Sequence, residues 1–532
     1  MKLIYAPSAR RMIPYPPVGT ALLAGAVDSL DDEVRLIDLE MTIWREHQRH
    51  GKVLLYAGHI DVPRVLAQNE DSELGDYEAL LVENSEIGAR EDVGISVMGF
   101  EQLASALLLA RAAASKGSRI ILGGQFWSES SARQVLGQLQ SDAVTVTVGD
   151  GWIPLQEWKT NPAEVPSSSF GFAAGEILQG RPAKGALQPP IPLYDSVDWD
   201  VYRAYSSDIL GDAREMRRAH LYVWDKLCPY KCNFCRVSSG SNAKLNSPET
   251  VVASLQHLLA QNVRQFNFMT NELNPTLAYM RRVIRELRPL LSGRDDIGWF
   301  TYLRPDHMEM EDLTALREIG CRLVRYGVET GSQRLSDRME KGYEIGTVAR
   351  VLRRAAEADI MNHVNFLIGY PGETDEDVEQ TIRFIAENHD VIHSVRLNPF
   401  YLPPGTRLAK DPAAYGLRLI EFRRGYWDFE MLDGTRPQKA VVKDRIERVT
   451  DAVMQYDIGF AGVLPFETLN SLSGYPTRDE GMAALRREHG YLWENASPDW
   501  LKARLGGYDM NAEWEETIYK RGRNYNLDVC TD

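Results

Sequence analysis

Three of the five cysteines in the chain lie within eight positions, at Cys228, Cys232 and Cys235. They stand in the segment LCPYKCNFCRVSSG, which follows the strand-like stretch HLYVWD. Three thiolates with C-x3-C-x2-C spacing can ligate one metal centre from a single loop. A structural zinc site would need a fourth ligand, and only His220 or a distant residue remains for it. A [4Fe–4S] cluster with three thiolate ligands instead leaves one iron open, which implies chemistry rather than structure.

The loop CPYKCNFC resembles the cluster loop of the radical SAM enzymes. The resemblance implies that Cys228, Cys232 and Cys235 hold a [4Fe–4S] cluster, whose fourth iron is chelated by S-adenosylmethionine (SAM). Phe234, the aromatic residue before the last cysteine, would pack beside the adenine of SAM. Reduction by the cluster would then cleave SAM into methionine and a 5′-deoxyadenosyl radical.

Two later segments are similar to the same superfamily. GCRLVRYGVETGSQRLSDRMEKG (320–342) resembles its fourth-strand region, which implies that Glu329 lies near bound SAM. NFLIGYPGET (365–374) resembles its fifth-strand turn, in which Gly369 would back the adenine. The three segments occur in the expected order, which makes the resemblance stronger than any one of them alone.

The resemblance also implies contacts to the methionine part of SAM. The segment MTNEL offers Thr270, Asn271 and Glu272 to the amino group, although the usual acidic pair is replaced by Asn-Glu. Arg304, in TYLRPDH, is a candidate partner for the SAM carboxylate, because a guanidinium can pair with a carboxylate bidentately. A surface arginine at a strand end is the alternative interpretation of Arg304.

Residues 1–160 alternate strand-like and helical segments, which predicts an α/β fold with a parallel, doubly wound sheet. The strand-like segments are LIYA, VRLIDLE, VGISVM, SRIILGG and AVTVTVGDG. No G-x-G-x-x-G motif follows the first of them, so NAD or FAD is not expected.

Four segments of this region, YPPVGTALLAG, DVGISVMGF, ILGGQFWSE and VTVGDGWIPL, resemble the Rossmann-like cobalamin-binding domain of class B radical SAM enzymes. Small residues would keep open the path of the nucleotide tail between strands and helices. No D-x-H-x-x-G motif occurs in the first loop, so no histidine of that motif is expected on cobalt. A module that binds nothing, or a nucleotide, is the alternative. The resemblance assigns to cobalamin Ser96, Val97, Met98, Gly123, Gly124, Gly149 and Gly151.

The rest of the chain divides into three parts. Residues 161–215 are rich in proline and are predicted to form a linker. Residues 216–405 contain six strand candidates separated by helical stretches, which predicts a (β/α)6 partial barrel. The resemblance assigns the radical SAM chemistry to this barrel. Residues 406–532 are predicted to form a mainly helical C-terminal domain, and the resemblance implies that it helps to close the substrate site.

The composition limits the partners. The formal net charge is −15, whereas a nucleic-acid binder normally shows a basic surplus, so no nucleic-acid partner is expected. The chain contains no apolar run of the length of a membrane span and no signal-peptide pattern at its start. Few cysteines and no export signal favour a cytoplasmic location.

Together the two resemblances imply a cobalamin-dependent radical SAM methyltransferase. The 5′-deoxyadenosyl radical would remove hydrogen from an unactivated carbon, and methylcobalamin would supply the methyl group. The substrate class is a small molecule or natural-product intermediate, for example in antibiotic biosynthesis, and a reductant such as flavodoxin or ferredoxin is required. The route needs no general base, so no catalytic side chain is predicted.

Other activities remain open at this point. Some class B enzymes contract or cyclise a ring without net methyl transfer, and others methylate an aromatic carbon without the radical. A tRNA methylthiotransferase carries a second cluster on three more cysteines in its N-terminal domain, whereas residues 1–227 contain no cysteine here. A cobalamin or SAM sensor without turnover would not need an open iron.

Overall fold

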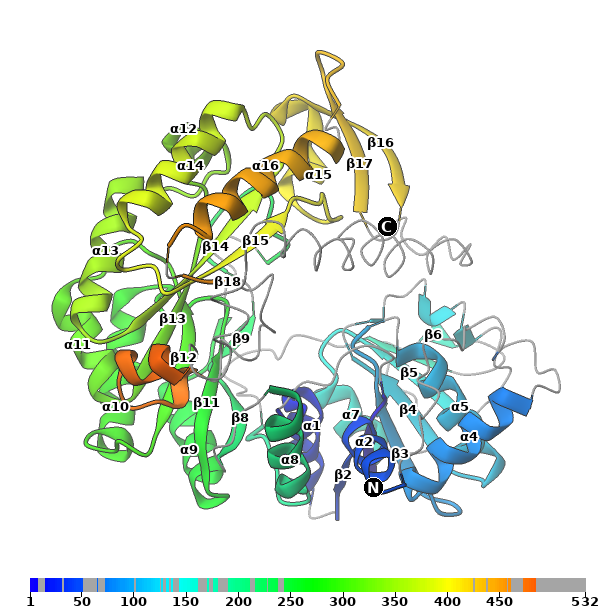
Figure 1. The fold of residues 1–532 in the computed structure, drawn as a ribbon. Coiled ribbons are helices and arrows are strands. Elements are labelled where there is room, and N and C mark those ends of the chain that lie inside the picture. Colours follow the sequence, from blue (N-terminus) through cyan, green and yellow to red (C-terminus); the bar gives the residue numbers. More distant parts are fainter. Residues whose placement is uncertain are drawn as a thin grey trace.

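The structure is a computed structural model of the 532-residue chain. Its two main bodies are a parallel sheet near the N-terminus and an open barrel in the middle of the chain (Figure 1). The residues that the structure describes are 1–7, 15–30, 33–50, 65, 72–99, 102–124, 126–127, 131–133, 135–136, 143–160, 170–171, 176–179, 190–210, 216–226, 228–237, 244–423, 426–436, 439–456, 458–460 and 472–484.

The first sheet has the strand order β2-β1-β3-β4-β5-β7-β6. All neighbouring strands are parallel except β6 and β7. The order 2-1-3-4-5 is that of a doubly wound sheet, which binds ligands at the carboxyl ends of its strands. Its strands are β1 (Lys2–Tyr5), β2 (Arg35–Asp38), β3 (Asp92–Ser96), β4 (Arg119–Gly123), β5 (Val144–Val148), β6 (Phe170–Gly171) and β7 (Glu176–Gln179).

Helices cover both faces of this sheet, as its apolar strands require. Helices α1 (Val18–Asp28) and α7 (Trp152–Thr160) pack on the face that carries Leu3. The opposite face, which carries Ile4, is covered by α2 (Leu39–His50), α4 (Ser72–Ser85) and α5 (Leu103–Ser115). The doubly wound sheet predicted from the sequence is confirmed.

The predicted linker is more structured than its proline content indicates. Strands β6 and β7 lie within it, and β7 extends the first sheet by pairing with β5. Helix α8 (Trp199–Leu210) also lies within residues 161–215. Segments 161–169, 172–175, 180–189 and 211–215 of this range are outside the described residues.

The second sheet is an open barrel with the order β8-β11-β12-β13-β14-β15-β18. All its neighbouring strands are parallel. The six predicted strands are confirmed, and β18 adds a seventh from beyond the predicted barrel. The strands are β8 (Arg217–Tyr222), β11 (Val263–Met269), β12 (Gly298–Leu303), β13 (Cys321–Glu329), β14 (Met361–Ile368), β15 (Ser394–Pro399) and β18 (Gly459–Phe460).

Helices line the convex side of the barrel (Figure 1). Alternate residues of each strand, such as Val324, Tyr326 and Val328 of β13, belong to the core beneath these helices. The residues between them therefore face the concave inner side. The covering helices are α9 (Pro248–Ala260), α10 (Leu277–Leu291), α11 (Met310–Glu318), α12 (Gln333–Arg338), α13 (Ile345–Glu357), α14 (Asp375–Glu387) and α16 (Lys439–Val453).

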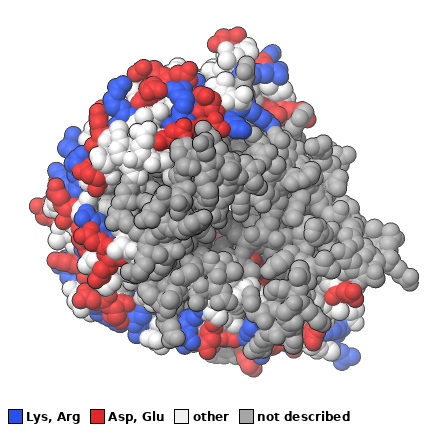
Figure 2. Space-filling model, in the orientation of Figure 1, with Lys and Arg blue, Asp and Glu red and all other residues white. Residues whose placement is uncertain are grey.

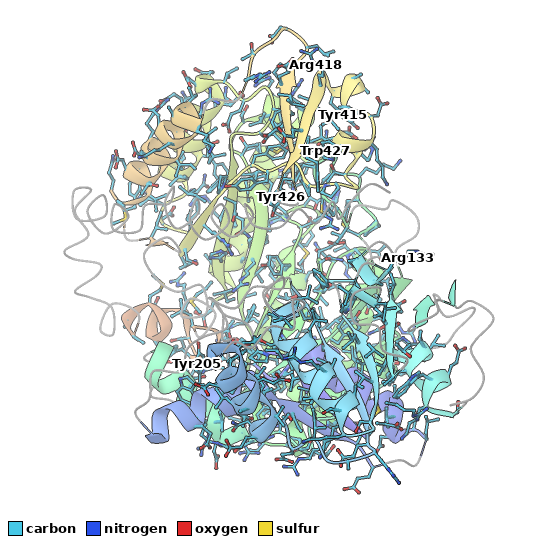
Figure 3. The ribbon with its side chains drawn as sticks, turned by 90° about the vertical axis from the view of Figure 1, so that its right-hand side faces the viewer. Arg133, Tyr205, Tyr415, Arg418, Tyr426 and Trp427 are labelled. Carbon is cyan, nitrogen blue, oxygen red and sulfur yellow. The ribbon has the colours of Figure 1, made fainter. Side chains whose placement is uncertain are left out.

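The segment after the barrel contains a hairpin that the prediction of a mainly helical region lacked. Strands β16 (Leu417–Arg423) and β17 (Tyr426–Met431) pair antiparallel, after the short helix α15 (Arg407–Lys410). In Figure 3 the end of the hairpin at Arg418 points away from the N-terminal domain, and the end at Tyr426 points toward it. Residues 485–532 of the predicted C-terminal domain are outside the described residues.

The two sheets are connected through α1 and the segment before β8. The backbone N–H of Leu193 donates to the carbonyl oxygen of Ala21 in α1 at 3.0 Å. Tyr15, from the loop after β1, contacts His220 of β8 with tilted rings whose centroids lie 4.7 Å apart.

The outer surface is polar. Acidic and basic side chains are interspersed over the barrel helices on the face shown in Figure 2. Within the described part of the chain, no helix is long and apolar enough to cross a membrane.

Candidate functional site

The three clustered cysteines lie on a loop at the carboxyl end of β8. A small antiparallel pair, β9 (Trp224–Lys226) and β10 (Lys244–Leu245), flanks this loop. The backbone N–H of Cys228 donates to the carbonyl of Val237 at 2.7 Å, and that of Cys235 to Cys232 at 3.3 Å. Cys232 is buried, and the other two thiols are half-buried. Among the residues that the structure describes, no three His, Cys, Asp or Glu side chains converge on one metal position. The donor set of three thiols on one loop still fits the ligands of a [4Fe–4S] cluster.

Asn233, which the sequence analysis did not single out, attaches the cysteine loop to the barrel. Its side chain is fully buried and donates to the carbonyl of Arg338 at 2.8 Å. Its amide oxygen accepts from the Tyr370 hydroxyl at 2.8 Å. Its backbone N–H donates to Met339, and its carbonyl accepts from Leu408. The loop is therefore held from three separate segments of the chain.

Glu272, at the end of the predicted MTNEL segment, lies beside the cysteine loop. Its side chain is buried and hydrogen-bonds with the thiol of Cys228. Burial raises the pKa of Glu272 to about 7. The same segment contains two predicted SAM contacts, Thr270 and Asn271. The Thr270 side chain is half-buried and donates to the carbonyl of Glu272 at 2.9 Å, whereas Asn271 is exposed.

Arg304 is buried at the end of β12, so the interpretation as a surface arginine is wrong. Its Nε and Nη2 atoms donate to Asp306 at 2.9 and 3.2 Å, and Nη2 also donates to the carbonyl of Lys341 at 2.6 Å. The guanidinium lies 3.7 Å from the ring centroid of Tyr230. These contacts fix the guanidinium within the site, and its role toward the SAM carboxylate stays a prediction.

Glu329 ends β13 in a left-handed backbone conformation, with φ of 70°. Burial raises the pKa of its carboxyl, and Lys341 opposes that shift from 3.5 Å. The Lys341 ammonium also lies 5.8 Å from the ring centroid of Phe234 on the cysteine loop. Lys341 therefore joins two predicted SAM contacts, although no local sequence pattern distinguishes it.

The turn after β14 has Gly369 at φ of 87°. A Cβ atom there would lie 3.0 Å from Cγ2 of Val442 in α16, so glycine lets that helix approach. The backbone N–H of Gly369 donates to Glu373 at 2.7 Å, and Arg445 contacts the same carboxylate at 3.3 Å. Phe234 packs near this turn, edge-on to Tyr370 with centroids 6.3 Å apart.

The predicted cobalamin residues meet at the carboxyl edge of the first sheet. Ser96 and Gly123 are paired at the ends of β3 and β4. Gly124 has φ of 115°, and a Cβ atom there would lie 2.2 Å from the carbonyl oxygen of Val97. Only glycine fits this close approach. Met98, the next residue, is 38% exposed at the edge.

A small cavity of about 20 Å³ lies at this edge, between the sheet and helices α1 and α7. Predicted residues Ser96, Gly123 and Gly151 line it, as do Thr20 of α1 and Thr147 of β5. Both threonine hydroxyls are buried and make no hydrogen bond with any described residue. Buried polar atoms normally have a partner, so the cavity fits a ligand that brings polar atoms. Gly149, the remaining predicted residue, has φ of 91° just after β5.

The sequence profile of the radical SAM superfamily matches residues 226–385, from the cysteine loop to α14. The chain therefore carries a radical SAM domain. An uncharacterized methyltransferase of Pyrococcus horikoshii is 28% identical over 241 residues, which are 44% of this chain and 49% of that protein. The tRNA-2-methylthio-N(6)-dimethylallyladenosine synthase of Hahella chejuensis is 30% identical over 173 residues, 30% of this chain and 38% of that protein. The chain thus spans about half or less of these relatives.

The fold is similar to that of two solved radical SAM proteins whose structures contain cobalamin. The radical SAM methyltransferase TsrM of Kitasatospora setae, solved with cobalamin and a [4Fe–4S] cluster, superposes with a TM-score of 0.54 at 18% identity, over 79% of this chain and 76% of that one. The enzyme OxsB, solved with aqua-cobalamin and SAM, superposes with a TM-score of 0.58 at 13% identity, over 100% of this chain and 81% of that one.

Proposed function

We propose that the chain is a cobalamin-dependent radical SAM methyltransferase that acts on an unactivated carbon of a small molecule. The cavity beneath α1 and α7 is the observation that supports cobalamin binding in this proposal. The hydroxyls of Thr20 and Thr147 would find partners in the nucleotide tail of cobalamin. The fold supports the same conclusion, because the solved structures of TsrM and OxsB that share it contain cobalamin.

In this proposal the three thiols on the β8 loop hold the cluster, and Glu329, Lys341 and Phe234 lie around SAM. When bound, the cluster and SAM supply a 5′-deoxyadenosyl radical, and methylcobalamin supplies the methyl group. The residues of the chain orient these groups rather than exchange protons with the substrate. Asn233 keeps the loop in place, and the buried Lys341 ammonium adds a positive charge beside carboxylates. A one-electron reductant such as flavodoxin or ferredoxin completes the system.

Methylthio transfer is the second candidate, because several curated relatives carry that name. Residues 1–227 contain no cysteine that could hold a second cluster. The cavity of the first sheet, which lies within these residues, favours cobalamin. Ring contraction, cyclisation and non-radical methylation of an aromatic carbon remain alternatives within the cobalamin-dependent class. The mass of the product separates methylation from ring contraction and cyclisation, since methyl transfer adds one methylene to the substrate.

The first test is the iron and cobalt content of the full chain after anaerobic reconstitution with iron, sulfide and hydroxocobalamin. We expect about four irons and one cobalt per chain. A Cys228→Ala, Cys232→Ala, Cys235→Ala triple variant should lose iron and SAM cleavage but keep cobalt. Cys321→Ala, at a buried cysteine of β13, is the matched control. Iron without cobalt would leave a radical SAM enzyme and remove the methyl-transfer proposal.

A further inference from the structure

The cysteine loop carries two basic residues on its exposed side. The backbone N–H of Cys235 donates to the carbonyl of Cys232 at 3.3 Å, so residues 232–235 form a turn. The Cα atoms at the two ends of such a turn lie less than about 7 Å apart. Lys231 directly precedes the turn and Arg236 directly follows it, and both residues are exposed. Two positive charges therefore flank the thiols at the surface of the molecule.

Described acidic residues do not neutralise these two charges. Neither Lys231 nor Arg236 forms an ion pair with any residue in the described part of the chain. Arg407 donates to the carbonyl of Lys231 at 2.9 Å and also pairs with Glu340, which places that carboxylate beside the loop. The Glu340 carboxylate accepts a further hydrogen bond from the Tyr415 hydroxyl at 2.9 Å. Because Arg407 balances Glu340, the loop keeps its positive surplus.

The sequence around the loop is basic, whereas the chain as a whole is acidic. The formal net charge of the chain is −15. The stretch 225–244 nevertheless contains one acidic residue, Asp225, and four basic ones, Lys226, Lys231, Arg236 and Lys244. A local surplus of one sign attracts a partner of the opposite sign. Val237, which follows Arg236, is 37% exposed and adds an apolar contact to this surface.

This face of the loop lies close to the thiols. Cys228 and Cys235 are half-buried, and Arg236 is next to Cys235 in the chain. The loop is attached to the barrel by the fully buried Asn233, whose amide oxygen accepts from the Tyr370 hydroxyl. A protein that contacts Arg236 is therefore one residue away from a thiol, and it needs no opening of the barrel to come that near.

We propose that the exposed face of the cysteine loop around Lys231 and Arg236 is the docking surface of an acidic protein that carries single electrons. The proposal rests on the proposed function, since it names the partner of the same site. One electron passes from the carrier, which is oxidised, to the cluster on the three thiols, which is reduced. Complementary charges speed the encounter and orient the carrier. Nucleic acid is also attracted by basic residues, but the net charge of the chain opposes it.

The test measures the binding of an isotope-labelled, oxidised flavodoxin of negative net charge to the reconstituted full chain by NMR titration. Raising the salt from about 0.05 to 0.5 M should weaken wild-type binding about 10-fold, because it screens surface charges. A Lys231→Glu, Arg236→Glu double variant should bind about 10-fold or more weakly at low salt, and Lys231→Gln with Arg236→Gln should lose less. The matched control is Arg285→Glu with Arg350→Glu, which changes the net charge equally at exposed positions of α10 and α13.

A second readout separates docking from damage to the cluster. Reduced methyl viologen, a small cation, should reduce the cluster of the double variant at the wild-type rate, whereas reduction by flavodoxin hydroquinone should slow about 10-fold. Iron content is measured on the same preparations. If the charge reversals lower it, the wild-type salt dependence and the glutamine variants decide alone.

Three results would overturn the docking surface. They are wild-type binding that does not respond to salt, equal affinity of the loop variant and the control for flavodoxin, and tighter wild-type binding of tRNA than of flavodoxin in the same buffer. The last result would assign the loop to nucleic acid. No step of the test needs cobalamin or substrate, so absence of cobalt would remove the proposed function and leave the docking result intact.

Discussion

The two parallel sheets of this chain build their sites in opposite ways. At the carboxyl edge of the first sheet, side chains are small or absent, and a cavity follows from Gly123 and Gly151. At the carboxyl edge of the barrel, charged groups such as Glu329 and Lys341 crowd together. The first edge leaves space between strands and helices, and the second places charged side chains next to one another. The difference teaches that a candidate cofactor site can be recognised by glycines and small side chains as well as by reactive groups.

The largest expected effect lies at the close approach of Gly124. An alanine there would place its Cβ 2.2 Å from the backbone of Val97 at φ of 115°. Left-handed strain and overpacking together should destabilise this edge by about 2 to 5 kcal/mol. Hydrogen exchange of β3 and β4 should accelerate, with cobalt lost and iron kept. Gly117→Ala is the control, since it has φ of 74° but only Arg90 at 3.6 Å. Similar effects of both variants would contradict the role of the close approach.

Filling the cavity tests the first sheet without disturbing its backbone. A Cβ at Gly151 would meet Leu23 at 3.6 Å and Thr147 at 3.8 Å, which are ordinary contacts. The longer side chain of Gly151→Leu would occupy the cavity, and we expect about 10- to 100-fold weaker cobalamin binding. Absorbance titration with hydroxocobalamin measures this. Gly19→Leu on α1 is the control, because nothing lies within 4 Å of its added Cβ. Unchanged affinity in Gly151→Leu would mean that cobalamin does not use the cavity.

The barrel side of the comparison is tested at Asn233. Asn233→Ala removes the side-chain bonds to Arg338 and Tyr370, and buried groups left without partners cost about 1 to 3 kcal/mol. The cysteine loop should therefore open more often, and iron should be lost to a chelator about 10-fold faster. Asn388→Ala, at a buried asparagine that ends α14, is the matched control. Loss of cobalt along with iron would contradict the separation of the two sites.

Asp38 is an exception among the small residues at the edge of the first sheet. It accepts a hydrogen bond from Tyr202 of α8, and burial raises its pKa from 3.8 to about 6. The Asp38 carboxyl ionises at a lower pH in the unfolded chain than in the folded protein. Its contribution to the free energy of unfolding therefore falls as pH rises from about 4 to 6, and is constant above that. Asp38→Asn should stabilise the protein above pH 6 by about 1 to 3 kcal/mol and have no effect below pH 4. Thermal unfolding across this range measures the difference, and a difference independent of pH would contradict it.

The strands and the cysteine loop could be predicted because their signals are local. Alternating apolar residues mark β13 and β14, and the spacing of Cys228, Cys232 and Cys235 fits within one loop. Strands β6 and β7 were missed, because a proline-rich stretch gives no pattern for pairing with β5. The hairpin β16–β17 was missed because many of its side chains are exposed, so its strands lack a marked pattern of apolar residues.

The residues of the candidate sites that the sequence analysis did not single out depend on distant contacts. Asn233 acts through Arg338 and Tyr370, which are 105 and 137 positions away. Thr20 and Thr147 meet at one cavity only after α1 has packed on the sheet. No local pattern distinguishes such residues from ordinary polar ones. The burial of Arg304 could not be predicted from the sequence either, because it depends on contacts with Tyr230 and Asp306 in the folded chain.

Helix α1 has a consequence for how the two halves communicate. It lines the cavity through Thr20, and it touches the segment leading to β8 so closely that a Cβ at Gly25 would lie 2.0 Å from the Ile191 carbonyl. Helix α1 also contacts β8, the strand that precedes the cysteine loop, so we expect a ligand that displaces α1 to shift β8 as well. Such a shift would link ligand binding in one half thermodynamically to ligand binding in the other, and the coupling would act equally in both directions.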